Sequence, residues 1–350
     1  MSKTRTKKLP AQLGYRYPAE WEPHAATWLS WPQLDGISFP DSYHRVVPTL
    51  VAMVEALAES EQICINVSDA VQEAEVRGYL SMRTRSQVRL VRIPTNEPWC
   101  RDHGPVFITR DKSPQLAVLD WTYNAWGGKY PPFDLDDQVP VRVAETLGVP
   151  IYSPGLVMEG GALDSNGQGT LLTTESCLLN ANRNPGVSQQ KIEQALKDYL
   201  GAEQILWLGD GIAGDDTDGH IDDLTRFVNA STVVTVVEEN RHEKNFQPLR
   251  DNLKRLGQMK LPDGRPLRVL QLPMPAPIER DDQRLPASYA NFYIANNSVL
   301  LPVFADPNDA IAEKILQQVF PERKIVPIDA RELIWGLGAF HCLTQQQPRV

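Results

Sequence analysis

The sequence has little cysteine, and what it has is scattered. Four cysteines, Cys64, Cys100, Cys177 and Cys342, are spread over 350 residues without a Cys-x-x-Cys pair. So few thiols in so long a chain argue against a disulfide framework and favour reduced cysteines in the cytoplasm. A His-Glu-x-x-His motif is also missing, so neither common zinc pattern is present. We therefore expect a cytoplasmic protein without a metal.

Long apolar runs, excess positive charge and phosphate-binding glycine motifs are missing as well. No stretch reaches the roughly 18 apolar residues of a membrane span. The formal net charge of -9 argues against a nucleic-acid partner. Neither Gly-x-Gly-x-x-Gly nor Gly-x-x-x-x-Gly-Lys-Ser/Thr occurs, so we expect no cofactor. The basic residues 1–14 are not followed by an apolar signal segment, and we expect them to form a flexible tail.

Helical and extended patterns alternate along the whole chain. Short apolar or β-branched runs predict strands, among them "ICINV", "VRLVRI", "PVFIT", "TLLTT", "QILWL", "TRFV", "TVVTVV", "LRVLQL", "NFYIAN", "SVLLPVF" and "KIVPI". Between them, helical periodicity covers residues 43–60, 137–148, 188–200, 242–257 and 307–319. This mixing is typical of the α/β class. Because 42% of the residues are hydrophobic and no linker divides the chain, we expect a single domain over residues 15–350.

Polar residues that do not suit a core gather just before several predicted strands. From Asp102 to Glu159, His220, Asn291 and Cys342 the gaps are 57, 61, 71 and 51 residues. A diverged repeat, in which each unit offers one loop to a common centre, would produce this spacing. The alternative is that α/β proteins in general place polar loops before strands.

Cys342 is the first candidate for chemistry. Gly336 and Gly338 in "GLGAFHC" allow a tight turn and a close approach of the backbone to a ligand. A cysteine is nucleophilic as the thiolate, so its surroundings must lower its pKa or supply a base. On an extended segment the adjacent His341 would point to the opposite face, which makes it a poor base for Cys342. A buried structural cysteine is the alternative.

The second candidate site is the acidic segment "GDDTDGHIDD". On an extended strand His220 and Asp222 would project from the same face, where His220 could act as general acid/base beside a cation held by Asp222. A calcium loop would need acids where Gly214 and Thr225 stand, so this pattern does not support a metal. A solvated acidic loop remains the alternative.

Two more clusters supply carboxylates and an aromatic ring. "NEPWCRDHGP" contains Asp102 and also Trp99, whose face could stack on a guanidinium; its Cys100 is a weaker nucleophile candidate without a glycine turn. "MEGGALDSNGQG" places Glu159 before two glycines. Negative charge raises the pKa of a thiol, so a cysteine among carboxylates makes sense if the substrate brings positive charge. A planar guanidinium fits this demand because its donors match two carboxylates.

Several motifs together resemble the agmatine deiminase family, often labelled peptidyl-arginine deiminase in bacteria. They are "EWEPHAATWLSWP", "WCRDHGPVFI", "LLNANRNPG", "DDTDGHIDD" followed by "FVNA", "SYANFYIAN" and "HCLTQQQP". The resemblance runs from about residue 15 to the end. It implies the fold of the guanidine-modifying superfamily, a pentein-like α/β propeller with five-fold pseudosymmetry and a central active-site pocket. It also implies a hydrolase in polyamine metabolism that acts without a cofactor.

The resemblance assigns roles to individual residues. Cys342 falls on the nucleophile, His220 on the general acid/base, Asp102 and Asp222 on the guanidinium-binding aspartates, and Glu159 on the carboxylate that supports them. The expected substrate contacts are Trp99, Trp126, Asp218 and Asn291. Three residues depart from the usual pattern: Leu337 and Ala339 interrupt the glycine-rich lead-in to Cys342, and Glu97 stands where Asp is frequent.

The resemblance predicts hydrolysis of a small cationic guanidine. The acids at 215, 216 and 218 favour agmatine, a dication, which would give N-carbamoylputrescine on the route to putrescine. Alternatives are a peptidyl-arginine or free-arginine deiminase, an amidinotransferase, and a cation-binding module without turnover. The sequence is also compatible with a homodimer.

Overall fold

The protein is described by a computed structural model over residues 8–350. The first half of the predicted tail, residues 1–7, lies outside the described residues. The short 3-10 helix η1 (Ala11–Leu13) follows, and the single domain expected over 15–350 stays a prediction.

Five small mixed sheets share one strand arrangement. In each, an outer strand pairs antiparallel with a middle strand, and the middle strand pairs parallel with the next. The sheets are β18 (Thr344–Pro348), β1 (His24–Ser30), β2 (Gln62–Val67) and β3 (Val88–Arg92); β4 (Val106–Thr109), β5 (Leu116–Leu119) and β6 (Ile151–Tyr152); β7 (Asp164–Ser165), β8 (Thr170–Thr174) and β9 (Gln204–Leu208); β10 (Thr225–Asn229), β11 (Thr232–Val237) and β12 (Arg268–Pro273); and β15 (Tyr293–Ile294), β16 (Ser298–Val303) and β17 (Lys324–Asp329). A separate hairpin consists of β13 (Glu279–Arg280) and β14 (Gln283–Arg284). The α/β class predicted from the sequence is confirmed.

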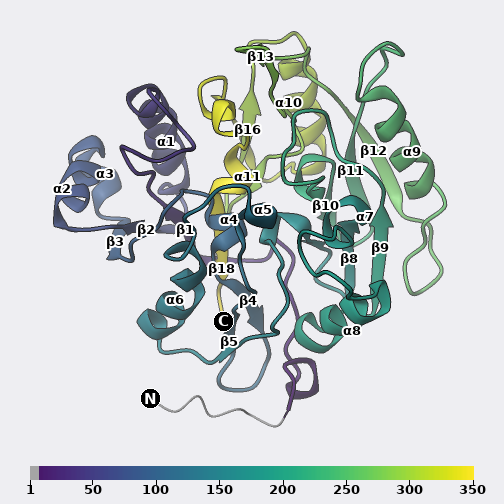
Figure 1. Ribbon diagram of the computed structural model, residues 1–350, viewed down its shortest axis with the longest axis horizontal. Helices are drawn as coiled ribbons and strands as arrows, with labels where there is room; N and C mark the ends of the chain where they lie inside the picture. The colour runs from purple at the N-terminus through teal and green to yellow at the C-terminus, as the bar shows by residue number, and fades with distance from the viewer. Residues whose placement is uncertain (1–7) are drawn as a thin grey trace.

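In each sheet a helix connects the middle strand to the strand that follows it in parallel. These helices are α1 (Tyr43–Leu57), α6 (Val139–Leu147), α8 (Gln189–Leu200), α9 (Phe246–Leu256) and α10 (Asn308–Val319), which match the five helical segments predicted from periodicity. Figure 1 shows them at the periphery, whereas the short helices α4 (Cys100–His103), α5 (Ala125–Gly128) and α11 (Phe340–Leu343) lie near the centre. The remaining helices are α2 (Ala70–Tyr79), α3 (Met82–Arg85), α7 (Glu175–Leu178), η2 (Asp136–Gln138), η3 (Gly160–Ala162), η4 (Ile221–Asp223) and η5 (Leu333–Gly336).

Helix α8 shows how local sequence sets these peripheral helices. The Ser188 side chain accepts a hydrogen bond from the N–H of Lys191 and caps the first turn. Ile192, Leu196 and Leu200 recur every four residues and are buried against the sheet, which is worth about 1.5–3 kcal/mol for each side chain. Gly201 ends the helix in the left-handed conformation, with φ of 67°.

The polar clusters occupy equivalent places in the five sheets. Helix α4 leads into β4, η3 into β7, η4 into β10, and α11 into β18, while the turn around residue 290 leads into β15. The spaced clusters of the sequence therefore each precede the outer strand of a sheet. None of the helices in residues 8–350 has the length and apolar character needed to cross a bilayer.

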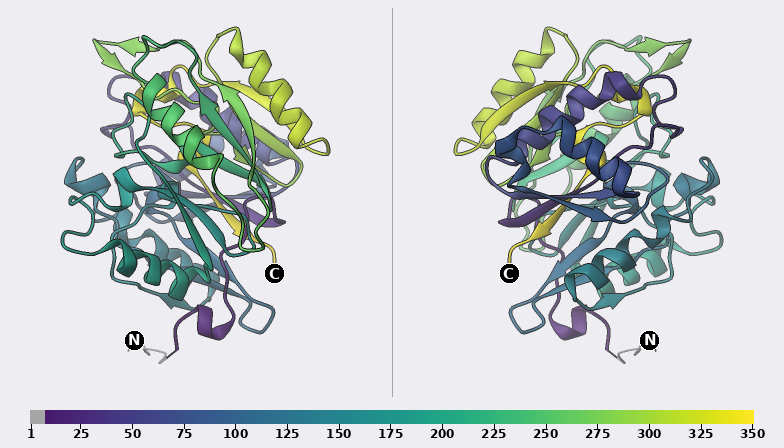
Figure 2. Two further views of the ribbon diagram at one scale, coloured as in Figure 1. Left: turned by 90° about the vertical axis from the view of Figure 1, so that its right-hand side faces the viewer. Right: turned by 90° about the vertical axis from the view of Figure 1, so that its left-hand side faces the viewer.

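The first sheet joins segments from distant parts of the chain. The polar strand β18 pairs antiparallel with β1, as Figure 2 shows for the yellow and purple strands. Thr344 and Gln345 of this strand are fully buried. In this antiparallel register the start of β1 lies beside the end of β18, with His24 opposite Pro348, and the end of β1 lies beside the start of β18, with Leu29 opposite Thr344.

Candidate active site

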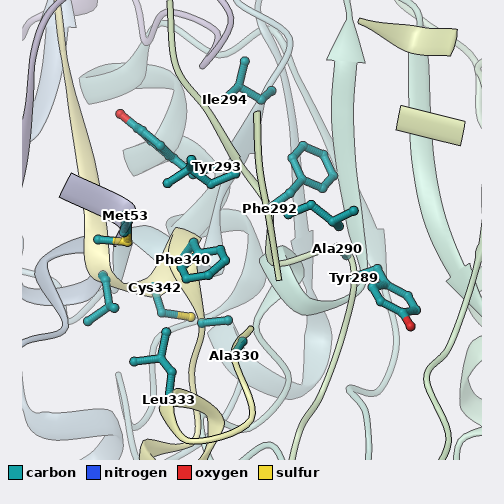
Figure 3. Close-up of a cluster of buried hydrophobic side chains, with 14 of the residues drawn as sticks. Met53, Tyr289, Ala290, Phe292, Tyr293, Ile294, Ala330, Leu333, Phe340 and Cys342 are labelled. Atoms are coloured by element: carbon teal, nitrogen blue, oxygen red, sulfur yellow. The ribbon is translucent and has the colours of Figure 1, made fainter. Parts of the chain in front are cut away.

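Cys342 lies in the one-turn helix α11 and is buried, with 5% of its surface exposed. Figure 3 shows it within an apolar cluster that also contains Phe340 and Leu333. Gly338 is needed beside it, because a Cβ there would come within 2.5 Å of the Trp99 ring and 3.0 Å of the Cys342 Cβ. The segment is helical rather than extended, so the strand geometry assumed for His341 and Cys342 is wrong.

Two polar groups contact the Cys342 sulfur. The Asn291 side-chain amide donates to Sγ at 3.0 Å, and Asp222 Oδ2 lies 3.6 Å from Sγ. Burial raises the pKa of the Cys342 thiol well above its usual value, and the carboxylates of Asp222, Asp223 and Asp102 raise it further. The resting cysteine is therefore a thiol that needs a cation nearby to ionise.

His220 sits at the centre of three carboxylates. Its ring nitrogens lie 3.7 Å from Asp102, 3.9 Å from Glu159 and 4.0 Å from Asp222, and neither makes a hydrogen bond within residues 8–350. Burial works against the charged form of His220, but Asp102 and Glu159 outweigh it and hold the pKa of the imidazole well above its usual value. His220 is thus a cation in the resting site. His220 directly precedes the 3-10 helix η4, which contains Asp222. The expectation that both side chains project from one face of an extended strand is therefore wrong, because a helical turn brings them together.

Asp102 accepts a hydrogen bond at each of its two carboxylate oxygens. The N–H of Gly161 donates to Asp102 Oδ1 at 2.9 Å, and Trp126 Nε1 donates to Asp102 Oδ2 at 3.0 Å. Burial raises the pKa of Asp102 to about 6; Asp222 and Glu159 add to this shift, and His220 opposes it. Asp102 is thereby oriented through both oxygens and is ionised at neutral pH.

Glu159 is supported by a buried arginine that the sequence reading missed. Arg183 Nε donates to Glu159 Oε1 at 2.5 Å, and the same guanidinium donates to Asp218 at 2.7 Å. Burial alone would raise the pKa of Glu159, but His220 and Arg183 lower it, so Glu159 is ionised. Asp218 also accepts from Lys129 at 2.9 Å and is not among the residues that line the cavity, so its contact with a substrate stays a prediction.

A cavity of about 200 Å³ opens onto these groups. It is lined by Ile37, Ser38, Pro40, Glu97, Trp99, Asp102, Trp126, Tyr130, Asp216, Thr217, Gln283, Trp335, Gly336, Leu337, Gly338 and Cys342. The expected residues Trp99, Trp126, Asp102 and Cys342 are therefore at its wall. His220, Asp222 and Glu159 are fully buried behind it, and Asn291 reaches the sulfur from within the core.

The three departures from the family pattern all lie at or beside the cavity. Glu97 accepts from the backbone N–H groups of Ile37 and Ser38 at 2.9 and 3.1 Å, which fixes that loop. Leu337 adopts φ of 69°, a left-handed conformation in which glycine is usual, and points its side chain into the cavity lining. Ala339 is buried directly before α11.

Two groups of side chains bring metal-ligand atoms together. The donor atoms of Glu159, Cys177 and His220, and those of Asp222, Asp223 and Cys342, lie within 4.8 Å of one another. Burial and nearby carboxylates raise the pKa of the Cys177 and Cys342 thiols, whereas burial lowers the pKa of His220 and its neighbours raise it above the usual value. Each group offers three possible ligand atoms, and all six residues are buried.

Residues that the sequence reading missed complete the charge pattern. His341 contacts Asp222 Oδ2 at 2.6 Å and Glu20 Oε2 at 2.8 Å, and Arg183 holds Glu159. Glu20 and Arg183 both lie in motifs that carried the family resemblance, "EWEPHAATWLSWP" and "LLNANRNPG". No local sequence pattern indicated a role for Glu20 or Arg183, because each pairs with a residue that lies in another segment of the chain.

The sequence profile described as Porphyromonas-type peptidyl-arginine deiminase matches residues 16–348. The chain belongs to this family. It is 36% identical to the agmatine deiminase of Ectopseudomonas mendocina, with 97% of both chains covered, and 36% identical to that of Stutzerimonas stutzeri, with 99% and 98% covered. The chain is thus a hydrolase of the agmatine deiminase type. The family membership that its motifs indicated is confirmed.

Solved structures of the family have the same fold. The agmatine deiminase of Enterococcus faecalis superposes with a TM-score of 0.93 at 34% identity, covering 99% of this chain and 100% of that one. A variant of the C. jejuni agmatine deiminase with substrate bound superposes with a TM-score of 0.88 at 30% identity, covering 96% of both chains. An amidinotransferase from Microseira wollei, at 12% identity and a TM-score of 0.53, shares the fold alone.

Proposed function

We propose that the protein hydrolyses agmatine to N-carbamoylputrescine and ammonia through a covalent intermediate on Cys342. The observation that supports this most is the convergence of one cysteine, one histidinium and three carboxylates at the base of a small cavity. Relatives named agmatine deiminase, at about 35% identity over nearly the whole chain, point to the same substrate.

The guanidinium is expected to bind between Asp102 and Asp222. Among the described residues, Asp222 Oδ1 and Glu159 Oε2 are buried without a hydrogen-bond partner, so they offer acceptors to an incoming donor. A planar guanidinium carries five N–H donors in a fixed fork and can satisfy several such oxygens at once. The Trp99 and Trp126 rings at the cavity wall suit the flat cation.

Substrate binding supplies the charge that the thiol needs. With the guanidinium and the protonated His220 close by, loss of the Cys342 proton to solvent becomes favourable, and the thiolate attacks the guanidinium carbon. The carbon–nitrogen bond then breaks, and His220 gives its proton to the departing ammonia. This leaves an S-alkylthiouronium group on Cys342.

Hydrolysis returns the enzyme to its resting state. Water enters the position that ammonia has left, and His220 takes a proton from it. The resulting hydroxide attacks the same carbon, the carbon–sulfur bond breaks, and the ureido product leaves with the thiol restored. One difficult displacement is thereby split into two easier steps.

The cavity favours agmatine over arginine. Its lining contains Glu97 and Asp216 and, within the described chain, no lysine or arginine that could pair with a substrate carboxylate. The volume of about 200 Å³ suits a small molecule and not a protein segment. A peptidyl-arginine or free-arginine deiminase is therefore the less favoured function, and an amidinotransferase less still.

We further propose that the five sheets are related by five-fold pseudosymmetry around this cavity. Their common strand arrangement supports this, as does the place of Asp102, Glu159, His220, Asn291 and Cys342 before the outer strands. Each unit would then contribute one wall of the active site.

The test is turnover of agmatine, with ureido product detected by colour, in the presence and absence of a chelator. Activity that the chelator leaves unchanged and that Cys342→Ser abolishes is the expected result. Free arginine and an arginyl peptide, assayed at equal concentrations, should give kcat/KM lower by at least about 10²-fold. Faster turnover of the peptide, or a trapped adduct on another cysteine found by mass spectrometry, would overturn the proposal.

A further inference from the structure

A second buried histidine lies directly behind the site and has no part in the chemistry above. His341 is only 1% exposed and contacts a carboxylate through each ring nitrogen. Nδ1 lies 2.6 Å from Asp222 Oδ2, and Nε2 lies 2.8 Å from Glu20 Oε2. Both distances are those of charge-assisted hydrogen bonds.

The two contacts fix the protonation of the ring. An ionised carboxylate accepts hydrogen bonds and donates none, and a neutral imidazole has only one N–H. If His341 were neutral, one ring nitrogen would set its lone pair against a carboxylate oxygen at less than 3 Å in a buried site. Both contacts are satisfied together when both nitrogens carry hydrogen.

The partner carboxylate Glu20 is itself firmly held. Its Oε1 accepts from the N–H of Ile294 at 2.7 Å, and its Oε2 pairs with Arg226 at 2.9 Å and with Arg101 at 3.3 Å. Arg101 also donates to the backbone carbonyl of His341 at 3.3 Å. The histidine is therefore anchored on the side away from the cavity and aimed at Asp222.

We propose that His341 carries hydrogen on both ring nitrogens in the resting site and orients Asp222 below the nucleophile, and so is a positioning residue for the guanidinium. The inference rests on the proposed function for the identity of that cation. The imidazolium engages Asp222 Oδ2 and leaves Oδ1 toward His220 and the substrate. The charged or titratable groups that surround it are Asp222, Glu20, Arg101, Arg226, Asp164 and Cys342.

Two substitutions separate the charge of His341 from its hydrogen bonds. In His341→Asn the amide nitrogen takes the place of Nδ1 and can still donate to Asp222 without a charge. In His341→Gln it takes the place of Nε2 and can donate only to Glu20. We expect KM for agmatine to rise about 10-fold in His341→Asn and about 100-fold in His341→Gln, with smaller losses in kcat.

The pH profile gives a readout that loss of structure alone would not move. Without the adjacent cation the Asp222 carboxylate holds its proton to higher pH, so its protonation should add to that of Asp102 and make the acid limb of kcat/KM steeper in both variants. His24→Gln is the matched control, because His24 is also buried and also contacts a carboxylate, Glu61 at 3.3 Å. That variant should lose stability and keep the wild-type KM and acid limb.

The protonation of His341 can be measured on the resting wild-type protein, without turnover. Nitrogen-15 NMR of the histidine rings should show hydrogen on both nitrogens of His341 at pH 7.5. A ring with a single N–H would overturn the proposal, as would a His341→Asn enzyme with the KM and acid limb of the wild type. If the wild type did not turn over agmatine, the proposed function would fail and the ring measurement would still decide the state of His341.

Discussion

Gly161 offers the sharpest test of the proposed active-site geometry, because a single methyl group would meet three side chains of the candidate site at once. A Cβ at this position would lie 2.5 Å from His220 Nδ1, 2.7 Å from Asp102 Oδ1 and 3.1 Å from Asp222 Oδ2. The backbone of Gly161 does not adopt a positive φ, so alanine brings no backbone strain of its own. Any effect of Gly161→Ala must come from the added carbon.

The expected loss follows from the size of the clash. Relieving a 2.5 Å contact requires a displacement of about 1 Å in His220 or in the loop that carries Gly161. A misplacement of that size in catalytic groups costs about 10²-fold in rate. We expect kcat/KM for agmatine to fall about 10²- to 10³-fold, equivalent to about 3–4 kcal/mol of transition-state stabilisation. Overpacking should cost about 1–3 kcal/mol in the free energy of unfolding.

Steady-state kinetics and denaturant unfolding, run on the same samples, measure the two effects. Gly78→Ala is the matched control, because Gly78 lies within helix α2 and a Cβ there meets no atom within 4 Å. Gly78→Ala should keep full activity and gain up to about 1 kcal/mol of stability. A folded Gly161→Ala protein with kcat/KM within threefold of the wild type would refute the assigned geometry.

Three further predictions concern carboxylates. Because burial raises the pKa of Asp102 to about 6, this carboxylate is ionised above that pH and neutral below it. We expect kcat/KM for agmatine to fall about tenfold for each pH unit below 6. A kcat/KM that stays constant down to pH 5 would contradict the role of Asp102. Burial also raises the pKa of Asp136 to about 8, so the folded protein holds the proton of this carboxyl group more tightly than the unfolded chain does. The stability that this proton contributes is fully present below about pH 4 and is lost as the pH rises to 8. Asp136→Asn keeps an acceptor for the N–H groups of Asn96 and Glu97, and denaturant unfolding should show a gain of about 1–3 kcal/mol at pH 9 and little at pH 4. Asp216→Asn should lower kcat/KM about tenfold for agmatine and not for arginine, and equal losses would argue against a role in binding the amine.

The sequence predicts best those elements whose signal is local. Helices α1, α6, α8, α9 and α10 each carry an apolar stripe of period 3.6, and all five were predicted. Strand β18 has the sequence Thr-Gln-Gln-Gln-Pro, which gives neither alternation nor an apolar run. It forms because β1, at the other end of the chain, accepts it as a partner, and no local pattern reports such a pairing.

Within the candidate active site, too, the residues with a local sequence signal were predicted and those that depend on a distant partner were not. Glycine turns and dense acidic segments made Cys342, His220 and Asp222 visible, and the structure brings these three together. The strand geometry first assumed for them was wrong, since Cys342 and Asp222 lie in one-turn helices and His220 directly precedes one. Glu20 and Arg183 were missed because a buried ion pair depends on which distant loops meet, and a single charged residue in a loop carries no sign of its partner.

The pairing of β1 with β18 also has a consequence for protein synthesis. Glu20 precedes β1, and His341 and Cys342 precede β18, so the reactive sulfur and the groups around it are assembled from opposite ends of the polypeptide. A nascent chain that has emerged only as far as β17 lacks both Cys342, the proposed nucleophile, and the edge strand of its first sheet. Under the proposed mechanism such a chain could not attack a guanidinium, and we expect activity only after β18 has paired with β1.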